Sequence, residues 1–276
     1  MPRAFFNAHN LGGEFLDLEN DLRLGTPTAV FGVNQPFKAL LAACCTQGRV
    51  VYVTDNAQTA SRMAAEIAGF SGEEVALLNA KDEVLLYKDA VSKDALYRRL
   101  EALWRIQNGA RLIVCDAESL LQLFPRKVRS LTLREGEETD FSSLSARLVS
   151  LGYTRTNSVE NRGQFALRGD ILEVYPVLGN PARVDFFGDT VEKIKPYDFL
   201  TGERLSTVRE WTIVAATDVF IEAEEAEGIR EVLFGELKNF KDAGAYERAL
   251  TIAGELSAKL DAFALDGHST LCFVIG

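Results

Sequence analysis

The first 126 residues alternate between short apolar runs and longer segments in which apolar side chains recur with the period of an α-helix. A run that is apolar at nearly every position predicts a strand buried on both faces, and such strands separated by helices are typical of a parallel sheet. The pattern therefore predicts an α/β domain over residues 1–126. Its expected strands are 28–31, 49–54, 75–78 and 111–115, and its expected helices are 35–45, 57–70 and 93–106.

The pattern changes after Pro125. Residues 127–133 alternate between apolar and polar positions, as a half-exposed strand does, and Asp140 is placed to cap a helix that runs to Leu151. Two runs of β-forming residues then flank the turn Gly179-Asn180-Pro181, which predicts a hairpin, and a further turn at Gly188-Asp189 leads into another strand. With a last strand at 211–215, residues 127–212 are predicted to form a small α+β domain with an antiparallel sheet.

The remaining residues read as two helices followed by a short apolar segment. Helical spacing covers 222–240 and 245–263, and Leu271–Gly276 has the composition of a strand that is cut short.

Charge is distributed unevenly along the chain of 276 residues, whose formal net charge is -10. Residues 126–215 contain 13 basic and 13 acidic side chains, so the rest of the chain carries the whole excess of negative charge. Nucleic-acid binding requires clustered lysine and arginine side chains, and this balance argues against it. A neutral, arginine-rich module beside acidic segments instead suits docking on a protein partner.

Several other classes of protein are not expected. The sequence has no apolar stretch approaching the ~18 residues of a membrane-spanning helix and no signal peptide, which predicts a cytoplasmic protein without a membrane partner. The four cysteines lack paired Cys-x-x-Cys spacing, and their apolar surroundings suit buried thiols better than disulfides or a metal site. They are Cys44, Cys45, Cys115 and Cys272.

One segment imitates a nucleotide-binding loop between a predicted strand and a predicted helix. The pattern G-x-x-x-x-G-K-[ST] is matched only at Gly32 and Lys38, while Phe37 and Ala39 stand where the second glycine and the hydroxyl should be. A phenyl ring blocks the backbone cradle, a methyl group cannot bind Mg²⁺, and Pro36 removes one amide donor. We interpret the segment as a strand-to-helix turn that binds no nucleotide, with Lys38 exposed to solvent.

No catalytic set is evident elsewhere in the sequence. Asp116 ends an apolar strand in the manner of a Walker B acid, but it is better explained as the N-cap of a helix over residues 117–124. His9 and His268 have no partner at metal-ligand spacing, and no nucleophile elbow is present. We predict no catalytic residue, no metal and no cofactor.

Three arginines in or near the predicted antiparallel strands are the candidates for partner binding. Arg155, Arg162 and Arg168 are accompanied by Phe165, a candidate apolar anchor. Solvated charges on a strand face are the simpler explanation, whereas arginine is also the preferred cation of protein interfaces. Phe165 and Arg168 are an odd number of residues apart, so on a regular strand they would face opposite sides, and either a bulge intervenes or only one of them makes contact.

Three motifs in this region carry a family resemblance. They are Gly152-Tyr153-Thr154-Arg155, Gly163-Gln164-Phe165-Ala166-Leu167-Arg168-Gly169, and the Phe-Phe-Gly-Asp-x-Val-Glu turn at 186–192. The sequence resembles the nucleotide-excision-repair family of UvrB and the transcription-repair coupling factor (Mfd). The resemblance implies that Arg155 and Arg168 contact the repair protein UvrA. Ala166 stands where UvrB tends to have another arginine, a contact that is lost or replaced by Arg162.

The resemblance also implies an architecture. It is a degenerate helicase-like parallel-sheet domain (1–126) with an inserted UvrA-binding α+β domain (127–212), after which residues 213–276 return to the first domain. The degenerate loop and the lack of room for a long aromatic hairpin between Leu86 and Leu96 favour the coupling factor, and the segment from Val84 to Asp94 also resembles that protein.

The function implied is that of a non-catalytic adaptor that recruits UvrA to stalled transcription complexes. In the full-length family protein, RNA polymerase and DNA are further partners, whereas the isolated fragment is expected to bind DNA weakly or not at all. The alternative is one half of a UvrB-type ATP-dependent helicase, which a complete nucleotide-binding loop would favour. A free-standing domain with a different partner is a third possibility.

Overall fold

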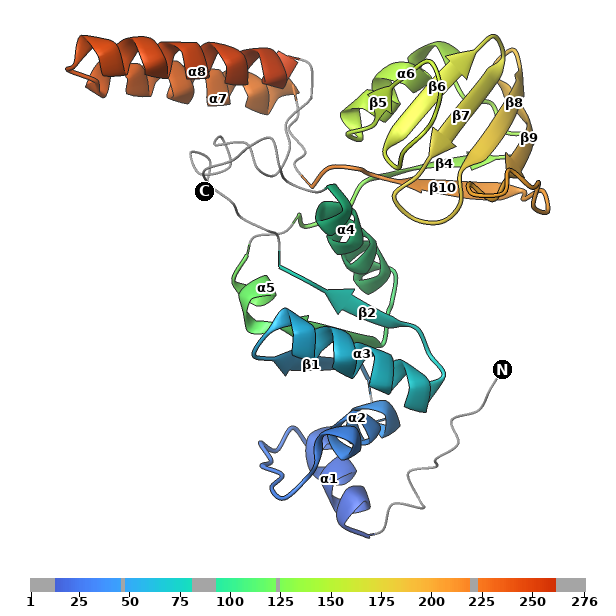
Figure 1. Ribbon diagram of the computed structural model, residues 1–276, viewed down its shortest axis with the longest axis vertical. Helices are drawn as coiled ribbons and strands as arrows, with labels where there is room; N and C mark the ends of the chain where they lie inside the picture. Colours follow the sequence, from blue (N-terminus) through green and yellow to red (C-terminus); the bar gives the residue numbers. More distant parts are fainter. Residues whose placement is uncertain (1–12, 46–47, 81–92, 123–124, 219–222, 262–276) are drawn as a thin grey trace. The chain divides into compact units, whose positions relative to one another are not determined.

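The computed structural model describes residues 13–45, 48–80, 93–122, 125–218 and 223–261 (Figure 1). The chain divides into two compact units. Unit 1 comprises Met1–Asp82 and Glu101–Leu123, and unit 2 comprises Glu83–Leu100 and Phe124–Gly276. The segments Val84–Ser92 and Leu271–Gly276, like His9, His268 and Cys272, lie outside the described residues.

Unit 1 is built on a parallel sheet of three strands in the order β1-β3-β2. The strands are β1 (Val50–Thr54), β2 (Val75–Leu78) and β3 (Leu112–Asp116). Its helices are α1 (Gly13–Arg23), α2 (Gln35–Cys44), α3 (Ala57–Ser71) and α5 (Ala117–Leu121), while α4 (Lys93–Gln107) has its second half in this unit and its first half in unit 2.

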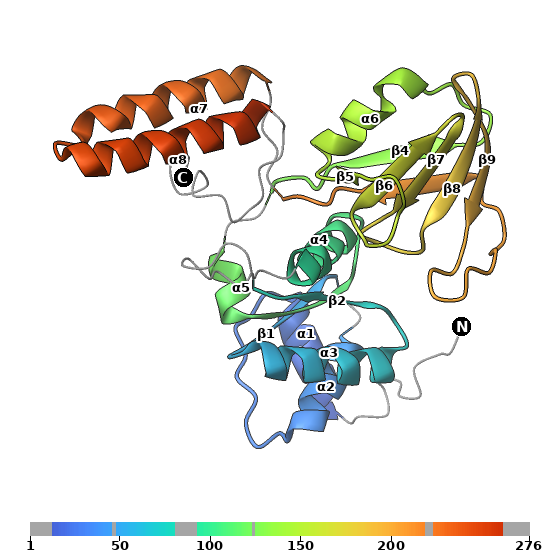
Figure 2. The ribbon, with the colours of Figure 1, turned by 45° about the horizontal axis from the view of Figure 1, so that its top comes forward.

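The core of unit 1 lies between α3, α2 and one face of the sheet (Figure 2). Met63 and Ile67 of α3 are almost completely buried and pack with Leu112 and Val114 of the central strand. Small alanines, among them Ala39 of α2, let the helices approach closely. This is the arrangement that apolar strands alternating with helices predicted, and the prediction of an α/β fold is confirmed.

One strand prediction in this unit is wrong. Residues 28–31 form no strand, and Val30 and Phe31 are 46% and 89% exposed. The run is short because Pro27 precedes it and Gly32, with a φ of 75°, follows it. A run of this length becomes a strand only where another strand offers it a ladder of hydrogen bonds, and its composition alone does not provide that neighbour.

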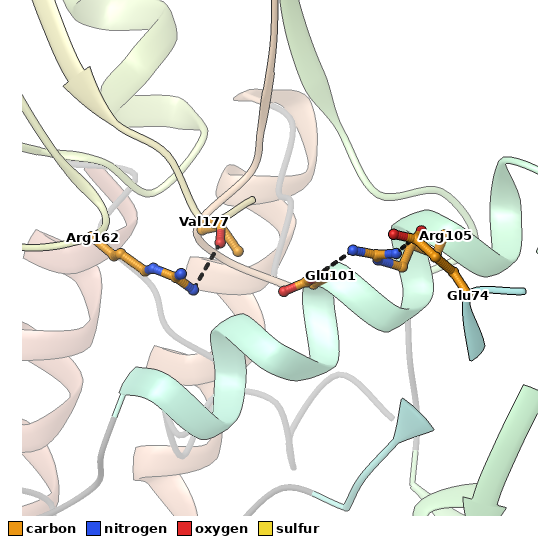
Figure 3. A network of polar contacts seen from close by, with 5 residues as sticks. All are labelled: Glu74, Glu101, Arg105, Arg162 and Val177. Atoms are coloured by element: carbon orange, nitrogen blue, oxygen red, sulfur yellow. Dashed lines mark hydrogen bonds and ion pairs between the residues drawn. The ribbon is translucent and has the colours of Figure 1, made fainter. Parts of the chain in front are cut away.

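Ion pairs fasten the turn after α3 to neighbouring parts of unit 1. Arg111 holds the carboxylate of Glu73 with two hydrogen bonds, 2.9 Å from Nε and 2.7 Å from Nη2. Arg105 lies between Glu101, at 2.9 Å, and Glu74 (Figure 3). The hydrogen bonds from Arg111, assisted by its charge, lower the pKa of Glu73 below its ordinary value.

The lowered pKa has a consequence for stability against pH. Because the folded state favours the ionised form of Glu73, its contribution is present above the unfolded pKa and is lost as the pH falls through the folded pKa. We expect Glu73→Gln to destabilise unit 1 at pH 7 by less than about 1 kcal/mol, since Glu73 is about half exposed. Urea denaturation should show the difference from the parent shrinking below about pH 4.5.

Unit 2 contains a five-stranded sheet in the order β5-β6-β7-β8-β9 and a separate antiparallel pair, β10-β4. All neighbours in the larger sheet are antiparallel except β5 and β6, which are parallel. The strands are β4 (Ser130–Arg134), β5 (Thr154–Arg155), β6 (Gln164–Arg168), β7 (Ile171–Tyr175), β8 (Ala182–Phe187), β9 (Thr190–Pro196) and β10 (Glu210–Val214). The helices are α6 (Phe141–Ser150), α7 (Ala223–Glu236) and α8 (Ala243–Asp261), with a 3₁₀ turn at Leu237–Asn239.

One face of the large sheet is buried, as the alternation along its strands requires. The helix α6 and the strand pair β4-β10 contribute further buried side chains to this core. The side chains with no exposed surface include Phe165, Leu172, Val184 and Ile194 of the sheet, Leu144 and Leu148 of α6, Leu133 of β4 and Ile213 of β10.

The hydroxyl of Tyr153 joins separate parts of unit 2. It donates a hydrogen bond to the carbonyl of Val214 at 2.6 Å and accepts one from the amide of Val177 at 3.2 Å. Tyr153 is 2% exposed, and burial raises the pKa of its phenol. The preceding Gly152 has a φ of 85°, and a Cβ there would come within 2.8 Å of Thr217. The Gly-Tyr motif is therefore a structural junction between the end of α6 and β10.

The other two sequence motifs, at 163–169 and 186–192, also have structural roles. A side-chain oxygen of Asp189, in the turn after β8, accepts the amide of Phe141 at 3.0 Å, and the rings of Phe141 and Phe186 lie 4.9 Å apart. These contacts fix the start of α6 on the sheet. Gly163 has a φ of 80°, and a Cβ at that position would collide with the hydroxyl of Tyr97. Glycine is thus required where α4 approaches the beginning of β6.

The junction at Tyr153 can be tested by removing one oxygen atom. Tyr153→Phe should lower the free energy of unfolding by about 2 kcal/mol, because a buried backbone carbonyl and a buried amide lose their partner. Urea denaturation of the parent and the variant measures the change. Tyr246→Phe is the control, since Tyr246 is 39% exposed and should tolerate the same change. Equal stability of Tyr153→Phe and the parent would contradict the assignment.

Of the helices predicted at 222–240 and 245–263, the parts within the described residues are confirmed as α7, with its 3₁₀ turn, and α8. They pack through Ala226, Leu256 and Leu260. Backbone pairing continues past the predicted boundary at 212, because Ala215 and Ala216 donate to carbonyls near β4 and α6. The return of residues 213–276 to the first domain stays a prediction. No helix among the described residues is long and apolar enough to cross a membrane.

Candidate partner-binding surface

Strand β6 carries two of the four predicted partner-binding residues on opposite faces. Its pairing with β7 runs from Gln164↔Tyr175 to Arg168↔Ile171 without a shift, so no bulge intervenes. Phe165 is completely buried and Arg168 is exposed. The regular strand thus excludes a bulge between the two residues, and of the two only Arg168 is exposed on the surface.

The prediction that Phe165 anchors a partner is therefore wrong, because its ring belongs to the core. Two apolar side chains that were not predicted from the sequence are exposed at the same end of the sheet as Arg168. Ile171 is 43% exposed and stands opposite Arg168, and Phe187 is 82% exposed at the end of β8. The doublet Phe186-Phe187 contained the signal, since alternation along a strand turns one of two adjacent rings outward.

Arg168 differs from Arg183 and Lys195, two other cations on its face of the sheet. Its Nε donates to the backbone carbonyl of Asn157, just after β5, at 3.1 Å, and Nη2 bonds to the same oxygen. Within the described part of the chain it forms no ion pair. By contrast, Arg183 pairs with Glu173 at 2.9 Å, and the ammonium of Lys195 pairs with Asp185.

Arg155 and Arg162 lie at other points around the same strands. Arg155 is exposed and stands opposite Phe165 in register, so it leaves the sheet on the side opposite to Arg168, along the β5 edge. Arg162 lies before β6 and donates to the carbonyl of Val177 at 3.3 Å (Figure 3). Its guanidinium lies 5.9 Å from the centre of the Tyr175 ring. The three arginines therefore surround the β5-β6 edge rather than form one cluster.

In the segment at 32–39, which imitates a nucleotide-binding loop in sequence, a side chain already caps the start of α2. The side chain of Asn34 caps α2 by accepting the amide of Phe37 at 3.0 Å, which occupies a donor that a phosphate would use. Ala39 is completely buried in the core, and Lys38 is exposed with its side chain in solvent. Gly32 retains a left-handed conformation, with a φ of 75°.

Asp116 has the structural role of a helix cap, as the sequence suggested. Its carboxylate accepts the amide of Ser119 at 2.7 Å and caps α5, and the residue is 2% exposed. The prediction of an N-cap is confirmed, although the helix it starts ends at Leu121. Burial raises the pKa of the adjacent Cys115 thiol. Among the residues that the structure describes, no group of His, Cys, Asp and Glu side chains is arranged to hold a metal ion.

Comparison with known proteins places this surface in a family. Residues 131–219, which contain the large sheet and all three arginines, match the family model of the UvrB interaction domain. The chain is 30% identical to a transcription-repair-coupling factor of Myxococcus xanthus over 231 residues, which is 77% of this chain and 19% of that protein. The chain belongs to the transcription-repair coupling factor family.

Other coupling factors show similar relationships. The protein of Mycobacterium tuberculosis is 34% identical over 186 residues, covering 63% of this chain and 15% of its own length. The protein of Staphylococcus aureus is 26% identical over 215 residues, covering 75% and 18%. The chain thus spans about a fifth or less of the coupling factors that it matches, and it corresponds to their UvrB-like module.

The geometry of the degenerate loop generates a prediction. Calorimetric titration with Mg²⁺-ATP up to about 1 mM should show no saturable site, because the helix cap already holds the amide of Phe37 and no hydroxyl is available for the metal. Lys38→Ala should give the same flat titration and the same melting temperature as the parent. Micromolar binding that disappears in Lys38→Ala would instead support the helicase alternative.

Proposed function

We propose that this chain is a non-catalytic adaptor module that binds UvrA through the β5-β6 edge of unit 2. In a full-length coupling factor, the module would recruit the excision-repair machinery to stalled transcription complexes. The match to the UvrB interaction domain and to coupling factors supports this assignment. RNA polymerase and DNA are proposed as partners of the full-length protein only.

The observation that carries the proposal is the contrast between Arg168 and its neighbours. Arg183 and Lys195 have carboxylate partners within the sheet, whereas the guanidinium of Arg168 is exposed and bonded to a backbone carbonyl. Such a guanidinium retains donors that a partner carboxylate can accept, and arginine in this position is typical of interface hot spots. Arg155, exposed along the same edge, supplies a second cation.

Apolar surface beside Arg168 strengthens the proposal. Ile171 faces Arg168 across the strand pair, and the backbone at Phe186 bonds to Asp170, which brings Phe187 close to the same turn. An exposed aromatic ring and an exposed arginine at the same end of a sheet have the composition of an interface centre rather than of an ordinary solvated sheet face. We assign to Phe187 the role of apolar anchor that was predicted from the sequence for Phe165.

The lack of catalysis is also part of the proposal. The two positions that would hold a nucleotide and its metal are engaged in helix caps, through Asn34 and Asp116. The net charge of -10 supports the proposal that this chain alone binds DNA weakly or not at all, because phosphate contacts need an excess of clustered cations. We therefore place recognition of a protein, rather than chemistry, in this part of the coupling factor.

Binding to purified UvrA tests the function directly. Arg168→Ala should weaken the equilibrium affinity at least about tenfold, since truncating a desolvated interface arginine typically costs 2 kcal/mol or more. Its melting temperature should stay near that of the parent because the side chain is exposed. Surface plasmon resonance with immobilised UvrA gives both the affinity and the rate constants.

A matched control separates this effect from a general loss of charge. Arg183→Ala removes an arginine from the same face that already has a carboxylate partner, and it should change UvrA binding little. Duplex DNA at physiological salt should not bind the unchanged chain appreciably. Failure of the unchanged chain to bind UvrA would refute the proposed function, and normal binding by Arg168→Ala would refute the assigned surface.

A further inference from the structure

The loop that follows β9 is braced by its own hydrogen bonds. The carboxylate of Asp198 accepts the amides of Leu200 and Thr201 at 2.9 and 2.8 Å and the hydroxyl of Thr201 at 3.1 Å. The amide of Asp198 donates to the carbonyl of Glu203 at 2.9 Å, and the amide of Gly202 donates to the carbonyl of Asp198 at 2.8 Å. The hydrogen bonds from the amide and hydroxyl of Thr201 and from the amide of Leu200 lower the pKa of Asp198, and the whole set holds the loop in a defined shape.

This braced loop holds an apolar side chain out into solvent. Leu200 is 92% exposed, and Leu205, at the other end of the loop, is 41% exposed. A single exposed leucine is common on folded proteins and needs no partner. Leu200 is different because the backbone around it is already ordered, so a partner could bury the side chain without paying for ordering the loop.

The loop is also continuous with one end of the candidate surface. The ring of Phe199 lies 4.6 Å from that of Tyr175, and the guanidinium of Arg162 lies over the same Tyr175 ring, 5.9 Å from its centre. Tyr175 pairs with Gln164 at the start of β6, whereas Arg168 stands at the end of the same strand. Leu200 and Arg162 therefore mark the end of the surface that is remote from Arg168, roughly 13 Å along the strand.

We propose that Leu200 is a second anchor for UvrA and that it enters an apolar pocket whose rim carries a carboxylate for Arg162. This inference rests on the proposed function and adds a contact at the opposite end of β6. Two anchors separated along a rigid strand would fix the orientation of the partner, which a single contact at Arg168 does not. Asp198 acts as a positioning residue because it holds the loop that presents Leu200.

The two ends of the surface should differ in their kinetics. Leu200→Ser should weaken UvrA binding about tenfold, mainly through faster dissociation, because a buried apolar contact acts after the encounter. Arg162→Ala should mainly slow association and reduce the dependence on salt, as expected for a charge at an interface rim. Leu200→Met, which keeps the apolar volume, should bind as the parent does.

A double-mutant cycle tests the proposed role of Asp198 in positioning Leu200. Asp198→Ala should weaken UvrA binding in the parent but add little in the Leu200→Ser background, because the loop then presents no anchor. Leu121→Ser is the matched control, since Leu121 on α5 of unit 1 is 87% exposed and outside the surface. It should bind UvrA as the parent does, and thermal melting should show that Leu200→Ser stays folded.

The outcomes separate this inference from the proposed function. If Arg168→Ala weakens binding while Leu200→Ser and Leu121→Ser both bind normally, the second anchor is wrong and the proposed function stands. If Leu200→Ser and Leu121→Ser are weakened equally, the effect is not specific to the loop and the second anchor is also wrong. If the unchanged chain does not bind UvrA, both are overturned.

Discussion

The hydroxyl of Tyr153 is the interaction on which the architecture of unit 2 depends. It satisfies the carbonyl of Val214 on β10 and the amide of Val177 after β7 from a position that solvent does not reach. Backbone hydrogen bonds from Gly136 to Val191 and from Val208 to Ile194 join the segments beside the β10-β4 pair to β9, whereas the Tyr153 bridge holds the end of β10. Because the bridge is directional, it defines where the β5-β6 edge stands relative to the core, and the exposed arginines take their places from it.

Much of this fold was predictable from the sequence, since the spacing of apolar residues is a direct record of which face of each element is buried. Asp116 and Asp140 could be recognised as helix caps because their capping is local. The failed strand at 28–31 shows the limit of such reasoning. A strand needs a neighbour, and the neighbour is chosen by parts of the chain that are distant in sequence.

The candidate surface was predictable only in part for a related reason. Composition and the family resemblance identified Arg155, Arg162 and Arg168, but they could not separate a cation with a carboxylate partner from one without. That distinction arises from cross-strand register, which places Glu173 beside Arg183 and Ile171 beside Arg168. The same register shows that Phe165 is a core residue, although its motif made it look like part of the interface.

The opposed faces of β6 also limit how this strand can change. Inserting or deleting one residue would exchange its two faces, burying the guanidinium of Arg168 and exposing the ring of Phe165. Folding and recognition would fail together, because both depend on the same alternation of side chains along β6. Substitutions at single positions can change the side chains of the outer face without disturbing the core, whereas any change of length in β6 would disrupt both the core and the exposed surface.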